Sequence, residues 1–158
     1  MRVQMQKIAI ITGGSRGLGR SEVLSIAERG TNCIFTYNSK REEADQVVEA
    51  ASAHGVKVRA LQLDLGKVST FDAFVDGVRS VLNQMGVERF DYLVNNAGIL
   101  RQSKFGDVKE EDPDRQYSIN FKGVLFLMQK LLPFINAGGR IINVGSSSTA
   151  FAMPGLGL

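Results

Sequence analysis

Three glycines within seven residues form the first group in this sequence that could do chemistry. Gly13, Gly17 and Gly19 follow a short apolar run at residues 8–11 and precede a helix-like segment. Glycine lets the backbone turn sharply, approach a pyrophosphate without an intervening Cβ, and pack the next helix closely on the strand. The unpaired N–H groups of that helix favour anionic oxygens. The stretch therefore indicates a nucleotide-phosphate site, although its G-x-x-x-G-x-G spacing is not the commoner one and many such turns bind nothing.

The charges around this turn bear on which nucleotide it would bind. An NAD site usually has an Asp or Glu about twenty residues beyond the glycines, where the carboxylate binds the ribose 2′-hydroxyl. Residues 37–41 contain no acid. Arg16 in the turn and Lys40 or Arg41 could instead contact a 2′-phosphate, and Ser39 could add a hydroxyl donor. The pattern predicts NADP(H) over NAD(H).

More polar residues follow other strand-like segments. Asp64 follows one, an Asn-Asn-Ala-Gly run at residues 95–98 follows the next, and serines stand at 146–148. Each has a plain structural interpretation as well. The asparagines could end a strand in a turn, the aspartate could approach a helix, and the serines could form a polar turn.

Strand-like and helix-like segments alternate along the chain. Apolar runs predict strands at residues 8–11, 32–37, 56–63, 90–95 and 139–144. Helical spacing predicts helices over 21–30, from about 44 to 55, after a capping box at 69–72, and from an Asp112 cap with Pro113 to about Ile135. The order predicts an α/β fold, a Rossmann-type doubly wound parallel sheet of about five strands. Ligands of such sheets bind at the carboxyl ends of the strands, where the polar residues above lie.

Composition indicates an ordinary globular chain. We expect residues 1–158 to form a single domain, because no linker or repeat divides them. The net charge of +3 comes from 19 basic and 16 acidic residues that form no basic stripe, which argues against nucleic-acid binding. Cys33 and one histidine supply neither a zinc site nor a disulfide. No apolar run has membrane-spanning length and residues 1–7 lack a signal pattern, so we expect a cytoplasmic protein.

With this order of elements, the sequence resembles the short-chain dehydrogenase/reductase family from about Lys7 onward. The family's T-G-x-x-x-G-x-G turn is similar to residues 12–19, its N-N-A-G segment to 95–98, and its serine-bearing strand end to 142–146. Asp64-Leu65 resembles its adenine-side acidic position, and Asn120 its mid-helix asparagine. The resemblance implies an enzyme that moves a hydride between a nicotinamide cofactor and a small carbonyl or alcohol substrate.

The resemblance also implies a role for each matched residue. Ser146 would bind the substrate oxygen, and Asn120 would help to hold a water relay unless it merely faces solvent. The choice of Ser146 over Ser147 or Ser148 rests on the family's register. The implied cofactor-binding residues are Thr12, Gly13, Ser15, Arg16, Gly17, Leu18, Gly19, Asn38, Ser39, Lys40, Asp64, Leu65, Asn96, Ala97 and Gly98.

The family's acid/base tyrosine and the lysine four positions beyond it have no match here. The family register places that tyrosine roughly thirteen positions after Ser146, and twelve residues follow Ser146. The fourth residue after Tyr37, Tyr92 or Tyr117 is never lysine. We therefore expect the N-terminal portion of such an enzyme, lacking its C-terminal elements, inactive as given and a homo-oligomer when complete. The alternatives are a non-catalytic dinucleotide-binding module or sensor, and a structural protein with an unused pocket.

Overall fold

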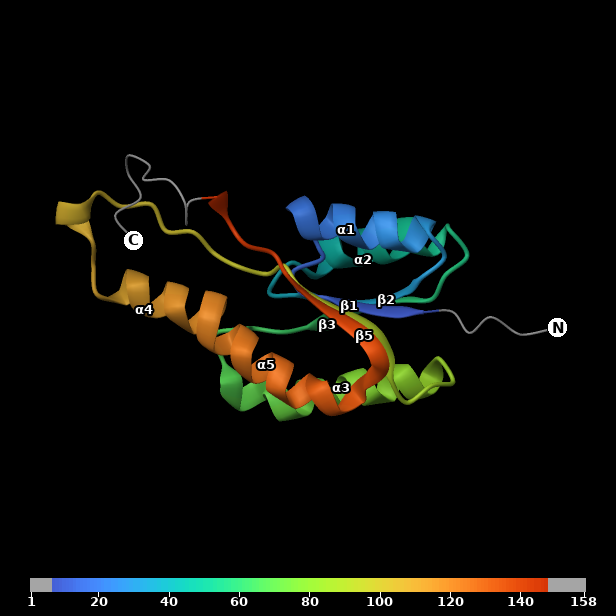
Figure 1. Ribbon diagram of the computed structural model, residues 1–158. Helices are drawn as coiled ribbons and strands as arrows, with labels where there is room; N and C mark the ends of the chain where they lie inside the picture. The colour runs from blue at the N-terminus through green and yellow to red at the C-terminus, as the bar shows by residue number, and fades with distance from the viewer. Residues whose placement is uncertain (1–6, 148–158) are drawn as a thin grey trace.

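A computed structural model describes residues 7–147 as a parallel five-stranded sheet with helices on both faces (Figure 1). The strands are β1 (Ile8–Ile11), β2 (Asn32–Tyr37), β3 (Val58–Gln62), β4 (Phe90–Asn95) and β5 (Ile135–Asn143). The helices are α1 (Gly17–Glu28), α2 (Arg41–Ser52), α3 (Phe71–Gln84), α4 (Glu111–Tyr117) and α5 (Val124–Leu131). The strand order β3-β2-β1-β4-β5 reverses beside β1. The α/β, Rossmann-type doubly wound sheet is confirmed.

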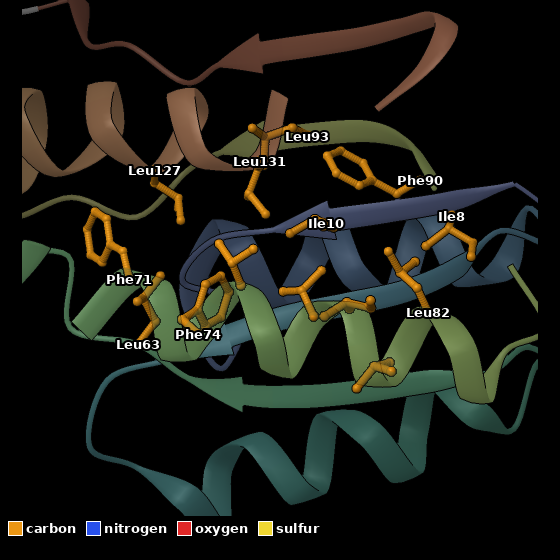
Figure 2. Packing of buried hydrophobic residues seen from close by; sticks show 14 of the residues in the cluster. Ile8, Ile10, Leu63, Phe71, Phe74, Leu82, Phe90, Leu93, Leu127 and Leu131 are labelled. Carbon is orange, nitrogen blue, oxygen red and sulfur yellow. The ribbon is translucent and has the colours of Figure 1, made fainter. Parts of the chain in front are cut away.

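The central strand β1 is buried on both faces. Ile8 and Ile10 pack with α3 and α5 in one apolar cluster (Figure 2), while Ala9 and Ile11 pack with α1 and α2 in another. This alternation follows from the two-residue repeat of a strand. None of the four residues is more than 2% exposed. The glycine turn that follows β1 therefore starts from a rigid support.

The predicted bounds hold for β1, β2 and β4, whereas the first helix begins earlier than expected. α1 starts at Gly17 and not at Ser21, with Arg16 in an extended conformation at the cap position. Glycine is a poor helix former, so the prediction placed the helix after the glycines. Close packing in the turn outweighs that preference, as the site geometry below shows.

The capping box expected at residues 69–72 does not form. A 3₁₀ turn at Val68–Thr70 leads directly into α3, and the side chain of Thr70 makes no capping hydrogen bond. Its hydroxyl donates to the carbonyl oxygen of Lys67 at 2.8 Å. The box would place Ser69 at the cap position of the helix, whereas Thr70 occupies that position and its hydroxyl is engaged with Lys67.

The single long helix expected between residues 112 and 135 is two helices joined by a wider turn. α4 begins one residue before the expected cap, and Ser118–Gly123 form a π-helical turn before α5. The glycine of this turn packs on backbone, because a Cβ there would lie 2.2 Å from the carbonyl oxygen of Leu65. Asn120 lies within the turn, and isolated π turns occur frequently at functional sites.

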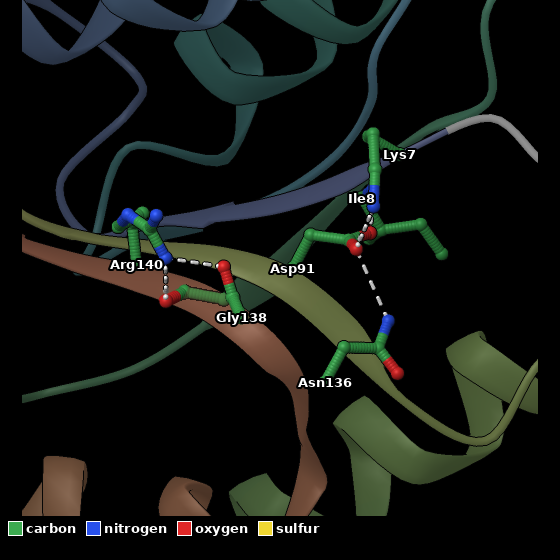
Figure 3. Close-up of polar contacts among 7 residues, drawn as sticks. Lys7, Ile8, Asp91, Asn136, Gly138 and Arg140 are labelled. Carbon is green, nitrogen blue, oxygen red and sulfur yellow. Dashed lines mark hydrogen bonds and ion pairs between the residues drawn. The ribbon is translucent and has the colours of Figure 1, made fainter.

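The strand predicted at residues 139–144 begins earlier, at Ile135, and contains a bulge. Phe90 pairs with Ile135, but Tyr92 pairs with Arg140, so extra β5 residues loop out between the two pairs. Gly138 has a φ of 80° within this bulge. The guanidinium of Arg140 donates to the carbonyl oxygens of Gly138 and Gly139 (Figure 3). The prediction began the strand at Gly139 and so left out residues 135–138.

Asp91 ties three segments together at the amino edge of the sheet (Figure 3). Its carboxylate accepts hydrogen bonds from Lys7 Nζ at 2.8 Å, the Ile8 amide at 2.9 Å and Asn136 Nδ2 at 3.1 Å. Burial alone would raise the pKa of Asp91, but these hydrogen bonds and the Lys7 charge outweigh burial and lower the pKa. The ionised carboxylate thus links the start of β1 to β4 and to the bulge of β5.

β5 lies at one end of the sheet and has a neighbouring strand on one side only, within residues 7–147. Its carboxyl half is exposed, with Ile141 at 39% and Ile142 at 51%. Over the same described range, no helix is long and apolar enough to cross a membrane.

Candidate functional site

The glycine turn is held by β2 as well as by β1. The Gly13 amide donates to Thr36 Oγ1 at 3.0 Å, and the Gly14 amide donates to the Thr36 carbonyl oxygen at 2.8 Å. Gly13 and Gly17 have φ values of 71° and 56°, which side chains with a Cβ rarely adopt. The turn's shape therefore depends on both its own glycines and a threonine that the sequence analysis did not single out.

Thr12 and Asn96 join this turn to the end of β4. The Thr12 hydroxyl oxygen accepts hydrogen bonds from the amides of Asn96 and Ala97 at 3.1 and 3.0 Å. Asn96 Nδ2 donates to the carbonyl oxygens of Thr12 and Gly13 at 3.0 and 3.4 Å. A Cβ on Gly19 would lie 2.2 Å from the Gly13 oxygen and 2.5 Å from Asn96 Nδ2. The glycine turn and the Asn-Asn-Ala-Gly segment thus form one unit.

A pocket of about 390 Å³ opens beside this unit at the carboxyl ends of the strands. Its lining includes twelve of the fifteen residues expected to bind a cofactor: Gly13, Ser15, Arg16, Gly17, Leu18, Gly19, Asn38, Asp64, Leu65, Asn96, Ala97 and Gly98. Thr12 is buried behind the turn, and Ser39 and Lys40 are exposed residues outside the lining. Thr36, Tyr37, Leu63, Ile99 and Ile119 also line it and were not expected. Their strand-end position would have revealed Thr36 and Tyr37.

The basic residues near the pocket differ in how they are engaged. Arg41 pairs with Asp45 at 3.4 Å, one helical turn along α2, and its pKa is raised by the nearby Tyr37 and by that carboxylate. Arg16 lines the pocket, is exposed, and forms no ion pair with any residue between 7 and 147. Arg16 is therefore the uncompensated cation of the turn.

Asp64 and Leu65 place one carboxylate and one apolar side chain at the end of β3. Asp64 Oδ1 accepts a hydrogen bond from the Gly66 amide at 2.9 Å, and Oδ2 lies 3.7 Å from Lys67 Nζ. Leu65 is buried, with 5% exposure. The backbone of Gly66 fixes the direction of the carboxylate, so a polar group and an apolar wall face the same pocket.

Asn120 holds the loop that follows β4. Its Oδ1 accepts a hydrogen bond from the Ile99 amide at 2.8 Å, and its Nδ2 donates to the Ile99 carbonyl oxygen at 2.8 Å. Each amide atom can make a second hydrogen bond, so capacity for a water remains. Gly98 lies directly beneath, because a Cβ there would stand 3.2 Å from Asn120 Oδ1.

Ser146 follows β5 at the same edge of the sheet and is exposed, but it does not line the 390 Å³ pocket. Ser147 is the last described residue, and Ser148 lies outside the described range. The end of β5 is tied to β4 by the Val144 amide, which donates to the Asn95 carbonyl oxygen at 2.9 Å. Asn95 Nδ2 also donates to Asn143 Oδ1 at 2.8 Å.

Two other sources of reactivity can be set aside for the described residues. Cys33 is buried, and burial raises the pKa of its thiol to about 12, so the reactive thiolate is scarce at neutral pH. Between residues 7 and 147, no cluster of three or more histidine, cysteine, aspartate or glutamate side chains could hold a metal ion.

Comparisons with known proteins agree with this geometry. The family profile described as short chain dehydrogenase matches residues 7–158. A 3-oxoacyl-[acyl-carrier-protein] reductase of Staphylococcus aureus is 37% identical over 155 residues, which cover 97% of this chain and 61% of the relative. A probable tetrahydroxynaphthalene reductase of Zymoseptoria tritici is 32% identical over 140 residues, covering 89% and 51%. The chain thus spans 61% and 51% of the lengths of these two relatives.

Two solved structures also have a similar fold. An angucycline C-6 ketoreductase with bound NADP superposes with a TM-score of 0.90 at 32% identity, covering 95% of this chain and 59% of that one. A short-chain dehydrogenase from Burkholderia cenocepacia in complex with NADP has a TM-score of 0.85 at 32% identity, with coverage of 96% and 61%.

Proposed function

The chain belongs to the short-chain dehydrogenase/reductase family, and on that premise we propose that it is the cofactor-binding part of an NADP(H)-dependent oxidoreductase. The enzyme transfers a hydride between the nicotinamide and a carbonyl or alcohol substrate. The observation that carries this proposal is the pocket at the switch point of the sheet, lined by the glycine turn and by the uncompensated Arg16.

The turn fits the phosphates of a dinucleotide. Apart from its chain neighbours and the backbone of its own helix, nothing lies within 4 Å of the position that a Cβ on Gly17 would take, so this face of the turn is open. The first turn of α1 begins at this residue, and its N–H groups favour anionic oxygens. Asp64 and Leu65 would hold the adenine side, and Asn96, Ala97 and Gly98 the opposite wall.

The cofactor preference follows from charge. Residues 37–41 at the end of β2 include no acid that could bind a ribose 2′-hydroxyl. Arg16 has no carboxylate partner among the described residues, whereas Arg41 has one in Asp45. Arg16 would contact a 2′-phosphate from the glycine turn. Ser39 and Lys40, which directly precede α2, would contact it from the other side.

When bound, the nicotinamide supplies or accepts the hydride. Ser146 then hydrogen-bonds the substrate oxygen, which polarises a carbonyl or orients an alcohol. Asn120 positions the Ile99 backbone and retains one donor and one lone pair for a relay water.

The names of two relatives support a proposal for the substrate class. The relatives named as a 3-oxoacyl-carrier reductase and an angucycline ketoreductase both reduce ketones on carbon skeletons. A small-molecule ketone, reduced with NADPH, is accordingly the substrate class proposed for this protein. Residues 1–158 form one NAD(P)-binding domain of it.

Titration of both cofactors into wild-type protein and Arg16→Glu tests the proposal. We expect NADPH to bind wild type more tightly than NADH, and Arg16→Glu to weaken NADPH binding by about 10- to 100-fold, the loss of one charge-assisted contact. NADH binding should change little. Arg20→Glu, one turn further along α1 and outside the pocket lining, is the matched control. Equal affinities for the two cofactors, or equal effects of both substitutions, would contradict the NADP(H) proposal.

One observation favours a second candidate, a dinucleotide-binding module without catalysis: the pocket of about 390 Å³ is lined by expected cofactor-binding residues, whereas Ser146 does not line it. NADPH binding without carbonyl reduction by the full-length protein would support the module.

A further inference from the structure

Two neighbouring asparagines at the end of β4 hold opposite halves of the site. Asn96 bonds the glycine turn, as described above. Asn95 faces β5: its Nδ2 donates to Asn143 Oδ1 at 2.8 Å, and its carbonyl oxygen accepts from the Val144 amide at 2.9 Å. Asn96 therefore bonds the cofactor half of the site, and Asn95 bonds the half that carries Ser146.

The hydrogen bond between Asn95 and Asn143 would be costly to lose because Asn95 is buried. Asn95 is 5% exposed, and its Oδ1 is buried and accepts no hydrogen bond from residues 7–147. Within the same range, the Asn95 side chain makes one hydrogen bond, from Nδ2 to Asn143. Removing the acceptor would leave the whole amide desolvated and unpaired, which is costly.

Asn143 is an unusual residue for this place. It is the last residue of β5, it stands opposite Asn95 in the strand register, and asparagine is depleted in strands. Between residues 7 and 147, β4 is the strand that pairs with β5, and its hydrogen bonds help to hold the carboxyl end of β5 in place. The amide pair explains an asparagine at a position that strand preference alone would not select.

From this arrangement we infer that Asn95 and Asn143 are positioning residues for Ser146, an inference that rests on the proposed function. Ser146 lies three residues beyond Asn143, and the side-chain bond and the Val144 backbone bond are the last β4–β5 contacts before it. A displacement of the strand end moves the serine hydroxyl relative to the cofactor half, which Asn96 fixes independently. Catalytic rates respond to displacements of about 1 Å by as much as 100-fold.

The test compares three variants of the full-length protein. Asn143→Leu removes the acceptor, Asn143→Asp keeps an Oδ acceptor for Asn95, and Asn136→Leu removes an amide from the other end of the same strand. Asn136 bonds Asp91 on β4, so this control also loses one β4–β5 side-chain bond. The readouts are kcat and KM for a ketone substrate, the Kd for NADPH, and hydrogen exchange over residues 140–147.

We expect Asn143→Leu to lower kcat by about 10- to 100-fold, the range for a misplaced catalytic group. Its NADPH Kd should stay within about twofold of wild type because Asn96 still holds the glycine turn. Exchange of the Val144 amide should accelerate. Asn143→Asp should restore most of the rate, and Asn136→Leu should leave kcat per folded molecule near wild type.

The inference is overturned if Asn143→Leu keeps its kcat, if Asn136→Leu loses as much, or if Asn143→Asp gives no rescue. A wild-type protein that binds NADPH but reduces no ketone refutes the proposed function instead. In that case the exchange data alone decide: faster exchange in Asn143→Leu supports the anchoring of the strand end, and unchanged exchange overturns it.

Discussion

Most single residues in this site act in one of two ways: glycines allow close packing because they have no side chain, and threonines accept hydrogen bonds from the backbone. A Cβ on Gly19 would collide with the Gly13 carbonyl oxygen and with Asn96, and a Cβ on Gly13 would lie only 3.0 Å from Ala97. The hydroxyl oxygens of Thr12 and Thr36 accept hydrogen bonds from backbone amides, so both residues hold the shape of the turn. The residues with proposed direct contact to reactants are therefore few, and Ser146 is the first to test.

Ser146→Ala in the full-length protein should lower turnover far more than it lowers cofactor affinity, because the hydroxyl is proposed to face substrate. We expect a loss of about 10²- to 10⁴-fold in kcat. Steady-state kinetics and NADPH titration give the two quantities. Ser147→Ala and Ser148→Ala are the matched controls for the strand-end register. A severe loss in either control, with normal rates for Ser146→Ala, would move the catalytic position.

At the scale of elements, the strands were predictable and the irregular segments were not. Continuous apolar runs such as Ile8–Ile11 favour buried strands in an alternating chain, and three of the predicted strand ranges hold to the residue. The bulge before Arg140 and the π-helical turn around Asn120 depend on contacts with distant segments. No local pattern reports such contacts. The same limit hid Thr36, whose role comes from its hydrogen bond to Gly13.

The network around Asp91 predicts how stability depends on pH. The pKa of Asp91 is lowered from its ordinary value of 3.8, so the folded chain binds fewer protons than the unfolded chain. This contribution is fully present above the unfolded pKa and is lost as pH falls through the folded pKa. Asp91→Asn should lower the free energy of unfolding near pH 7 by about 1–2 kcal/mol, since a weaker acceptor remains for Ile8 and Asn136.

Urea unfolding of wild type and Asp91→Asn between about pH 7 and pH 3 measures this effect, and the variant should show the flatter pH dependence. Asp76→Asn is the control, because Asp76 forms an exposed pair with Arg79. Exposed pairs contribute little. Equal pH profiles for wild type and Asp91→Asn would refute the role of the carboxylate.

At the scale of the whole molecule, the described residues contain a cofactor pocket and an exposed apolar strand. Ile141 and Ile142 on β5 and Val144 just beyond it are each at least 39% exposed, and the outer edge of β5 has no strand partner in the described range. Such an edge can pair with another chain. The same 158 residues contain no Tyr-x-x-x-Lys sequence for proton transfer.

A polypeptide of residues 1–158 alone should therefore bind NADPH, reduce no ketone and associate with itself. Loss of the acid/base group alone removes about 10²–10⁴ in rate. NADPH oxidation with a panel of ketones measures turnover, and light scattering after size exclusion measures association. The control is the full-length protein assayed in parallel. Robust turnover by a monodisperse monomer of confirmed mass would show that proton transfer uses a group within these residues.

The hydrogen bonds from Asn96 and Ala97 to Thr12 also determine when the pocket can first exist during biosynthesis. Their donors and acceptor are separated by 84 and 85 residues, and Ile8 likewise waits for Asp91. Translation at about 5–20 residues per second puts roughly 4–17 seconds between the two partners. Once residues 32–37 have been synthesised, the nascent glycine turn can have β2 beside it, but it lacks the β4 side until the end of the interval. The pocket is thus completed late in synthesis. Until then the edge of β1 that pairs with β4 is unpaired and accessible to a chaperone.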